Sequence, residues 1–404
     1  MRSHKPDTNK LHDAPQKVPT WQDVVKFFSL RRYWRNGSIF RKILIVFIGL
    51  ILICLGTMYG IARWYIYTQS KLPLNLGVTF IPDYAESYGL NPQQTMQAMI
   101  SDLGVTNFRL TSYWNDIETS PGVYNFSDLD WEFQMADQAH ANVILTIGLR
   151  QPRWPECHMP SWAANEPESV WYPQLKTFMG VVINRYKDNP ALQSYQLENE
   201  YFLKAFGECT NYSRSRLVDE FNFVKQLDPY HSIIISRSNN AIGWPVNQPI
   251  PDEYGVSIYK RVWDKNITHR YFEYPFPAWF YAFLAGITEI TQHRNLIIHE
   301  LQAEPWPPSG TVNQNSIAEQ NKSMNAKILL SRFQYGEATG IRTIYLWGAE
   351  WWYYRLVVDH DPSLWNVAKY EFNQAKVENS LLQNKYQPQV GYLKFFKLTS
   401  SKEN

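Results

Sequence analysis

Short runs rich in β-branched and aromatic residues recur along this chain, and helix-like segments separate most of them. Eight runs follow one another, at 74–80, 107–112, 142–149, 192–197, 232–237, 254–259, 295–300 and 342–347. Several are almost wholly apolar, which is typical of strands buried on both faces of a parallel sheet. Eight strands alternating with helices predict an α/β fold, a (β/α)8 TIM barrel. The alternative is an open doubly wound sheet, but no Gly-rich phosphate loop follows any of the runs.

The segments between the runs carry apolar residues at spacings of three and four, which is the period of an amphipathic helix. Asn91 can cap a helix over 92–103, since proline stands at its first position and Gly104 at its end. Further helices are expected at 129–141, 173–188, 214–227, 277–293, 317–338 and 361–374. The segment between the fifth and sixth runs is rich in Pro and Asn, and we expect no full helix there.

Residues 43–62 (ILIVFIGLILICLGTMYGIA) form a stretch without a charge. As a helix it would span about 30 Å, the thickness of the hydrocarbon core of a bilayer. Basic residues crowd its N-terminal side (Arg31, Arg32, Arg35, Arg41 and Lys42). The positive-inside rule therefore predicts a single transmembrane helix, a signal-anchor with the N-terminus in the cytoplasm and the rest outside it. The alternative is a cleaved signal peptide, whose leader and apolar run are normally shorter.

The charge is divided unevenly along the chain. Residues 1–42 hold ten Lys or Arg and three Asp, while the other 362 residues hold 29 basic and 34 acidic side chains. An acidic body argues against nucleic acid as a partner, and the basic arm is explained by membrane orientation. We expect a basic cytoplasmic arm at 1–42, the transmembrane helix at 43–62, a juxtamembrane linker at 63–73, the barrel at 74–376 and a polar C-terminal tail at 377–404.

Of the three cysteines, Cys54 lies in the apolar stretch, which leaves Cys157 and Cys209 as a pair outside the cytoplasm. We predict a disulfide between them, with two buried free thiols as the alternative. The nine His and three Cys show no metal-ligand spacing. A Gly-x-Ser-x-Gly elbow is also missing, so no metal, cofactor or serine nucleophile is expected.

In a parallel barrel the active site lies at the C-terminal ends of the strands. The residues at the ends of the runs combine aromatic rings with charged and amide groups: Arg109, Trp114, Arg150, Trp154, Asn199, Glu200, Tyr259, Glu300, Trp347 and Glu350. Aromatic faces stack on the C–H surfaces of sugars, and amides and carboxylates bind hydroxyl groups, so we expect a carbohydrate site. One carboxyl group with a raised pKa and one that stays ionised can cleave a glycosidic bond. Arg109 and Tyr259 are placed to keep Glu300 ionised.

Four segments carry a resemblance to a known group. YQLENE (195–200) resembles the fourth-strand motif of clan A retaining glycoside hydrolases, and IIHELQAEPW (297–306) resembles their seventh-strand motif. FRLTSYWNDIETSPGVYNFSDLDW (108–131) is similar to their second-strand segment, and YLW (345–347) to the end of their eighth strand. The resemblance covers about residues 74–375. Its motifs name no single family within the clan, so the substrate stays open.

The resemblance implies a role for several residues. Glu200 would be the acid/base, Asn199 would contact the 2-hydroxyl of the sugar, and Glu300 would be the nucleophile. Trp347 would form the floor of the subsite that holds the reacting sugar. Gln196 departs from the pattern, since many relatives carry Glu there.

Several assignments stay open in the sequence. Glu198 is the alternative to Glu200, and Glu304 is the alternative to Glu300 and a possible substrate contact. Trp114, Trp154 and Trp306 are either sugar platforms or loop-packing residues, and Glu350 binds either a hydroxyl or a basic side chain. His299 is expected to be a packed, hydrogen-bonded residue.

We therefore expect a membrane-anchored retaining β-glycosidase that cleaves O-glycosidic bonds with two Glu. Its partners would be a glycoside, oligosaccharide or polysaccharide substrate and the lipid bilayer around 43–62. The alternatives are a non-catalytic carbohydrate-binding barrel and a transglycosylase that remodels a surface glycan.

Overall fold

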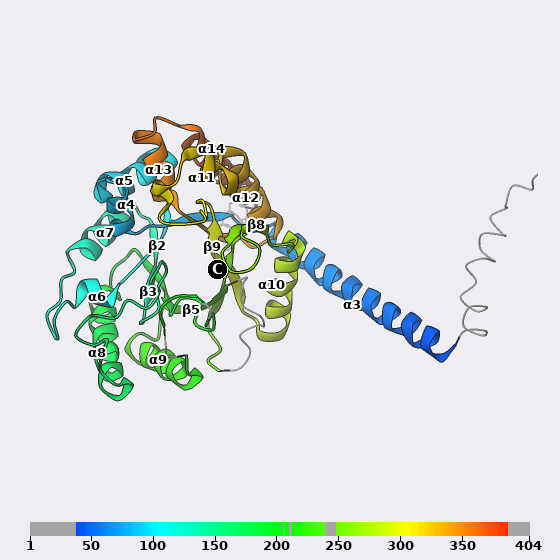
Figure 1. Cartoon of the computed structure of the whole chain (residues 1–404), viewed down its shortest axis with the longest axis horizontal. Helices are drawn as coiled ribbons and strands as arrows, with labels where there is room; N and C mark the ends of the chain where they lie inside the picture. The colour runs from blue at the N-terminus through cyan, green and yellow to red at the C-terminus, as the bar shows by residue number, and fades with distance from the viewer. Residues whose placement is uncertain (1–37, 205, 210–211, 239–247, 387–404) are drawn as a thin grey trace, which may run out of the picture. The chain divides into compact units, whose positions relative to one another are not determined.

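The computed structural model describes residues 38–204, 206–209, 212–238 and 248–386 (Figure 1). The chain forms two compact units, Met1–Thr57 and Met58–Asn404. The second unit contains a closed barrel of parallel strands in the order β1-β10-β9-β6-β5-β4-β3-β2. The strands are β1 Asn75–Thr79, β2 Asn107–Leu110, β3 Asn142–Ile147, β4 Leu192–Leu197, β5 Ser232–Ser238, β6 Glu253–Ile258, β9 Asn295–Gln302 and β10 Thr343–Trp347. Each of the eight predicted runs supplies one strand, so the predicted TIM barrel is confirmed.

Helices surround the strands in Figure 1. Their bounds are α4 Pro82–Ser87, α5 Pro92–Ala98, α6 Trp114–Ile117, α7 Ser127–Gln138, α8 Glu168–Tyr186, α9 Arg214–Leu227, α10 Ala278–Gln292, α11 Ile317–Ser323, α12 Ala326–Ala338, α13 Ala349–Val357 and α14 Ser363–Tyr386, with a π-helical turn η1 at Met99–Leu103 and a 3-10 turn η2 at Val312–Gln314. The predicted cap of α5 is present, because Asn91 Oδ1 accepts a hydrogen bond from Gln94 N at 2.9 Å. The predicted helix at 317–338 is two helices, since the Asn325 side chain caps a new start at α12.

Between the strands, one segment differs from the sequence prediction, and another lies outside the residues that the structure describes. A two-stranded hairpin, β7 Arg261–Asp264 and β8 Arg270–Glu273, follows β6 and was not predicted. Much of the Pro- and Asn-rich segment after β5, residues 239–247, lies outside the described residues.

Packing fills both sides of the barrel wall. A large cluster of buried apolar residues lies between strands and helices, and a small one is formed by Ile144, Ile234, Ile297 and Tyr345 inside the barrel. Gly77 on β1 makes room for the Tyr345 ring, because a Cβ atom there would lie 2.7 Å from it. The register places Arg109 on β2 opposite Thr79 on β1.

The helix α3, Ile39–Gln69, is long and apolar enough to cross a membrane, a property that signal sequences near an N-terminus share. From Met58 onward it belongs to the barrel unit. Ala62 and Tyr65 are buried there, and Ile61 lies against Gly286 on α10. The segment predicted as a linker, 63–73, is therefore helical as far as Gln69.

The last helix also crosses a predicted boundary. α14 continues to Tyr386, so the first ten residues of the predicted tail at 377–404 are helical. Asn379 on this helix holds the start of β1, because its Oδ1 accepts from Leu74 N at 2.7 Å and its Nδ2 donates to Leu74 O at 2.8 Å. The residues after 386 lie outside the described ranges.

Candidate active site

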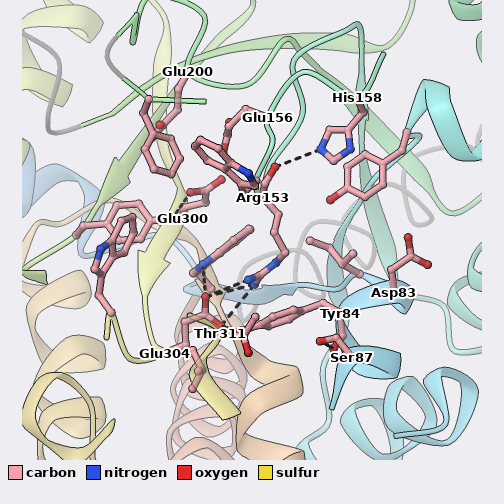
Figure 2. Close-up of a pocket in the computed structure, with 18 of the residues that line it drawn as sticks. Asp83, Tyr84, Ser87, Arg153, Glu156, His158, Glu200, Glu300, Glu304 and Thr311 are labelled. Atoms are coloured by element: carbon pink, nitrogen blue, oxygen red, sulfur yellow. Dashed lines mark hydrogen bonds and ion pairs between the residues drawn. The ribbon is translucent and has the colours of Figure 1, made fainter. Parts of the chain in front are cut away.

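A cavity of about 620 Å³ opens at the C-terminal ends of the barrel strands. Its walls carry carboxylates and aromatic rings together, many of which Figure 2 draws. They include Tyr84, Tyr113, Arg153, Trp154, Glu156, His158, Glu200, Tyr259, Glu300, Glu304, Trp306 and Trp347. Five residues that the sequence assigns to a site thus reach the cavity: Trp154, Glu200, Tyr259, Glu300 and Trp347.

Glu300, near the end of β9, accepts hydrogen bonds on both carboxyl oxygens. Arg109 Nη1 donates to Oε1 at 2.7 Å, and the Tyr259 hydroxyl donates to Oε2 at 2.6 Å. Both donors favour the ionised carboxylate, and the carboxyl group is only 3% exposed. Burial and the neighbouring Glu300 raise the pKa of Tyr259 well above its ordinary value, so its hydroxyl remains a donor.

Arg109 itself is fully buried and links Glu300 on β9 to residues of β4 and the turn after it. Its Nε donates to Gln196 Oε1 at 2.6 Å, and its Nη2 donates to Asn199 Oδ1 at 3.0 Å. Gln196 Nε2 donates to the same Asn199 oxygen at 2.9 Å. The amide of Gln196 therefore connects Arg109 with Asn199, a function that a carboxylate at this position could fulfil only for Arg109.

Glu200 lies just beyond β4 in the left-handed backbone region, with φ of 43°. Its backbone N donates to Ser236 Oγ at 3.0 Å, which fixes the turn. The carboxyl group is buried, and its Oε1 has no hydrogen-bond partner among the described residues. Burial first, and then the charges of Glu300 and Glu156, raise the pKa of Glu200 to about 8. Glu200 is therefore protonated at neutral pH and has a proton to donate.

The alternative carboxylate, Glu198, lies away from the cavity. Its two oxygens accept from Leu149 N and Arg150 N, each at 2.8 Å, and it pairs with Arg216 at 3.4 Å. These contacts hold the loop after β3 against β4. Glu198 is thus a structural residue of the loops that carry the cavity.

Glu304 is the second alternative carboxylate. Both of its oxygens accept hydrogen bonds from other residues that line the cavity (Figure 2). Trp347 Nε1 donates to Oε1 at 2.8 Å, and the Tyr84 hydroxyl donates to Oε2 at 2.7 Å. Arg153 pairs with Glu304 at 3.3 Å and lies over the rings of Tyr84 and Trp347. Glu304 therefore fixes the Trp347 ring, the predicted floor of the sugar subsite.

Two residues predicted as substrate contacts, Trp114 and Glu350, are instead buried in contacts with the protein itself. Trp114 is fully buried, donates through Nε1 to Glu118 Oε2 at 2.7 Å and stacks near Phe178. Glu350 is 1% exposed and accepts from Ile81 N at 2.8 Å. Neither residue lines the cavity, and each supports a loop behind it.

Four further residues that the sequence singled out lie behind the cavity wall. Arg109 and Asn199 are buried and do not line the cavity, although Arg109 reaches Glu300. Arg150 donates from Nε to the Asn199 carbonyl at 2.7 Å. His299 is buried beside Ser257, with Nε2 and Oγ 3.1 Å apart, and burial lowers its pKa well below the ordinary value. It is thus the packed histidine that the sequence indicates.

The sequence missed several residues of the cavity wall. Tyr84 lines the cavity from α4 after β1, and Tyr113, Arg153 and Glu156 line it from the loops after β2 and β3. The sequence signal that could have identified them is their position shortly after a predicted strand. The predicted cysteine pair is joined in the structure, Cys157 to Cys209, next to Glu156.

Neither a protein-family model nor a curated protein sequence matches this chain. Solved structures do match in three dimensions. One is a β-galactosidase from Halorubrum lacusprofundi, with a TM-score of 0.50 and 14% identity over 75% of this chain and 58% of that chain. Another is a cold-adapted β-galactosidase from Rahnella sp. R3, with a TM-score of 0.50 and 11% identity over 77% of this chain and 57% of that chain.

A third is a GH5_18 protein from Bifidobacterium longum subsp. longum in complex with Manβ1-4GlcNAc, with a TM-score of 0.50 and 10% identity over 68% of both chains. The fold is similar to that of clan A glycoside hydrolases. The chain spans less than three fifths of the length of the two β-galactosidases. At these identities the likeness concerns the closed eight-stranded barrel.

Proposed function

We propose that this protein is a membrane-anchored retaining β-glycoside hydrolase. The observation that carries the proposal is the pairing of two unlike carboxyl groups in one cavity. Glu200 is buried with an unpartnered oxygen and a raised pKa, whereas Glu300 is hydrogen-bonded on both oxygens by Arg109 and Tyr259. One group suits proton donation and the other suits nucleophilic attack.

In the first step a Glu300 oxygen attacks the anomeric carbon while Glu200 donates its proton to the glycosidic oxygen. The bond between the anomeric carbon and that oxygen breaks, and the leaving group departs as an alcohol. The sugar is then an ester of Glu300. Because the charge of Glu300 is one cause of the raised pKa of Glu200, ester formation lowers that pKa.

In the second step the Glu200 carboxylate removes a proton from water, and the water oxygen attacks the anomeric carbon. The bond to Glu300 breaks, Glu300 regains its charge and Glu200 is again protonated. Two inversions at one carbon give net retention of configuration. The lowered pKa of Glu200 in the ester favours its ionised form, as its role as a base requires.

The cavity walls support a sugar substrate. Trp154, Trp306 and Trp347 line the cavity with aromatic rings, and Trp154 is 58% exposed at the cavity edge. The structural neighbours include β-galactosidases and a protein that holds Manβ1-4GlcNAc, so β-linked galactosides and mannosides are the first substrates to test.

A panel of aryl β-glycosides tests this proposal, with proton NMR used to identify the anomer that forms first. We expect turnover of at least one glycoside with the β-anomer released first. Glu300→Gln should reduce turnover by at least about 10⁴-fold, and Glu200→Gln should reduce it far less on substrates with activated leaving groups. Release of the α-anomer, or full activity of the Glu300 variant, would contradict the proposal.

We also propose that α3 anchors the barrel outside the cytoplasm. The apolar stretch, the basic residues before it and the disulfide between Cys157 and Cys209 support this placement, since disulfides persist in oxidising compartments. Proteolysis of intact cells and of inverted membrane vesicles tests it. Cleavage of the barrel only in inverted vesicles would show the opposite orientation.

A further inference from the structure

Glu156 is a third carboxyl group in the cavity wall, and the double displacement does not use it. Its side chain is only 5% exposed but lines the cavity together with Glu200 and Glu300 (Figure 2). Oε2 accepts from Asn199 Nδ2 at 3.1 Å and lies 3.5 Å from Arg150 Nη2. Oε1 is not engaged by any residue in the described part of the chain. Glu156 therefore keeps an acceptor for a ligand.

The environment of Asn199 shows why Glu156 matters. Asn199 Oδ1 already accepts from Arg109 and Gln196, which uses both of its lone pairs. Its Nδ2 donates to Glu156, and Asn199 does not line the cavity. Glu156 thus lies between the cavity and the Asn199 amide that the sequence resemblance assigns to the sugar.

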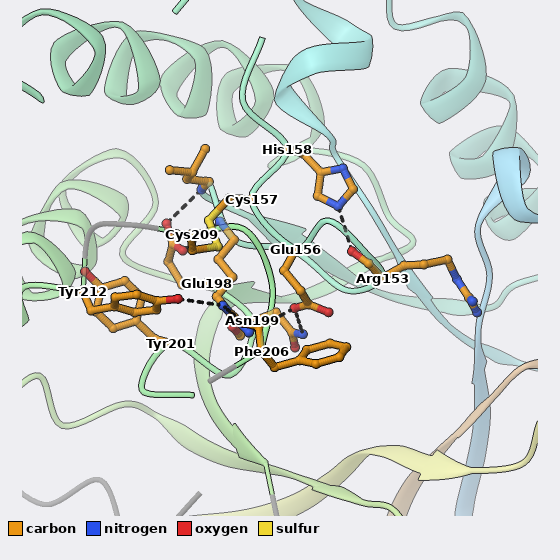
Figure 3. The surroundings of a disulfide bond; sticks show 12 residues. Arg153, Glu156, Cys157, His158, Glu198, Asn199, Tyr201, Phe206, Cys209 and Tyr212 are labelled. Carbon is orange, nitrogen blue, oxygen red and sulfur yellow. Dashed lines mark hydrogen bonds and ion pairs between the residues drawn. A yellow bond between two sulfur atoms is a disulfide. The ribbon is translucent and has the colours of Figure 1, made fainter. Parts of the chain in front are cut away.

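A disulfide bond and a close backbone contact hold Glu156 in this position, and Figure 3 shows the surroundings of the disulfide. The disulfide between Cys157 and Cys209 joins its neighbour to the loop after β4. In that loop Gly207 has φ of 89°, and a Cβ atom there would lie 2.8 Å from Glu156 Cβ. Glu156 itself has φ of 71°, a conformation that costs an L-residue energy and persists only where the surroundings fix it. The carboxyl group is therefore preorganised.

The charges around Glu156 define which ligand groups it can take. Arg150 and Arg109 are the cations that act on it, while Glu300 and Glu200 are nearby carboxyl groups. Arg150 is already shared with the Asn199 carbonyl. A hydroxyl or ammonium group of the sugar can donate a hydrogen bond to the Glu156 oxygen, whereas an anionic substituent has no proton to donate and would lie near the charge of Glu300.

We propose that Glu156 is a substrate-binding residue that accepts a hydrogen bond from a hydroxyl or amino group of the sugar held between Glu200 and Glu300. The site then binds a neutral or amino sugar at this subsite. This assignment rests on the proposed function for the identity of the reacting sugar. It differs from the sequence-based one, in which Asn199 makes the contact.

Aryl glycosides that lack one hydroxyl each test the assignment in the full-length protein. Wild type should lose about 10- to 100-fold in kcat/KM on one of these analogues, which is the effect of losing one hydrogen bond in a buried site. Glu156→Ala should lose activity on the parent glycoside and no longer discriminate against that analogue, while it still discriminates against the others. Glu156→Gln, which retains an acceptor oxygen, should recover part of the discrimination.

Glu208→Gln is the matched control, since Glu208 lies on the same disulfide-bonded loop and is exposed. It should behave as wild type. If Glu156→Ala and wild type discriminate equally against every analogue, Glu156 makes no such contact. Near-ultraviolet circular dichroism checks folding, and if Glu156→Ala is unfolded, the nearly isosteric Glu156→Gln decides the question.

Calorimetric titration with lactose and with Manβ1-4GlcNAc separates this inference from the proposed function. Sugar binding that Glu156→Ala weakens at least about tenfold, without any turnover, would support Glu156 and overturn the hydrolase. Turnover that Glu156 variants leave unchanged would support the hydrolase and overturn the role of Glu156. Absence of both binding and turnover would overturn both.

Discussion

Replacing Glu200 by Gln should make the folded protein less sensitive to alkaline pH. Burial, followed by the charges of Glu300 and Glu156, raises the pKa of Glu200 from 4.5 to about 8. Below about pH 4.5 the carboxyl group is protonated in the folded and the unfolded chain alike, so it has no effect on the free energy of unfolding. Between the two values the unfolded chain releases the proton and the folded protein keeps it.

The free energy of unfolding therefore falls by about 1.4 kcal/mol for each pH unit in this window. At pH 8 and above the loss is complete and amounts to about 5 kcal/mol. Gln is neutral at every pH and resembles the protonated acid in shape, so Glu200→Gln avoids the loss. Its stabilising effect should be small near pH 5 and largest above pH 8.

The assay is thermal unfolding of the full-length protein in detergent, followed at pH values from about 5 to 9. Relative to wild type, Glu200→Gln should gain roughly 10 °C in Tm at the alkaline end and little at the acidic end. Glu86→Gln, which changes an exposed carboxylate on α4, is the control and should follow wild type. A difference between Glu200→Gln and wild type that does not grow with pH would refute the reasoning.

Three further predictions concern the same site and its supports. Tyr259→Phe removes a 2.6 Å hydrogen bond to the buried Glu300, so kcat/KM should fall about 10- to 100-fold without loss of folding, as steady-state kinetics will measure. Trp347→Ala should raise KM more than it lowers kcat for aryl glycosides, and an unchanged KM would argue against a sugar platform. Replacing Cys157 and Cys209 together by Ser opens a loop with a sequence separation of 52, and should cost about 4 kcal/mol in chemical unfolding; equal stability of the variant would contradict this.

The barrel could be predicted because its strands are buried on both faces. Such strands are short, apolar and regularly spaced, so each leaves a local pattern in the sequence. The same regularity placed Glu200 and Glu300 at strand ends. The hairpin β7–β8 could not be predicted in this way, because its strands are four residues long and partly exposed.

The direction of individual side chains beyond the strand ends was harder to predict from the sequence. Trp114 and Glu350 follow strands as a site residue would, but each lies in the first turn of a helix and is buried. Glu156 was missed because its place depends on contacts with Asn199 and with Gly207, which are more than forty residues away in the sequence. Contacts of this kind leave no local pattern.

Covalent trapping tests the central claim most directly. A 2-deoxy-2-fluoro glycoside of the preferred sugar with an activated leaving group should slow release of the glycosyl-enzyme, and peptide mass spectrometry then locates the label. We predict one sugar per chain, attached to Glu300, in wild type and no label in Glu300→Gln. A label on another residue, or turnover of the parent glycoside without any trapped intermediate, would contradict the assignment of Glu300 as the nucleophile.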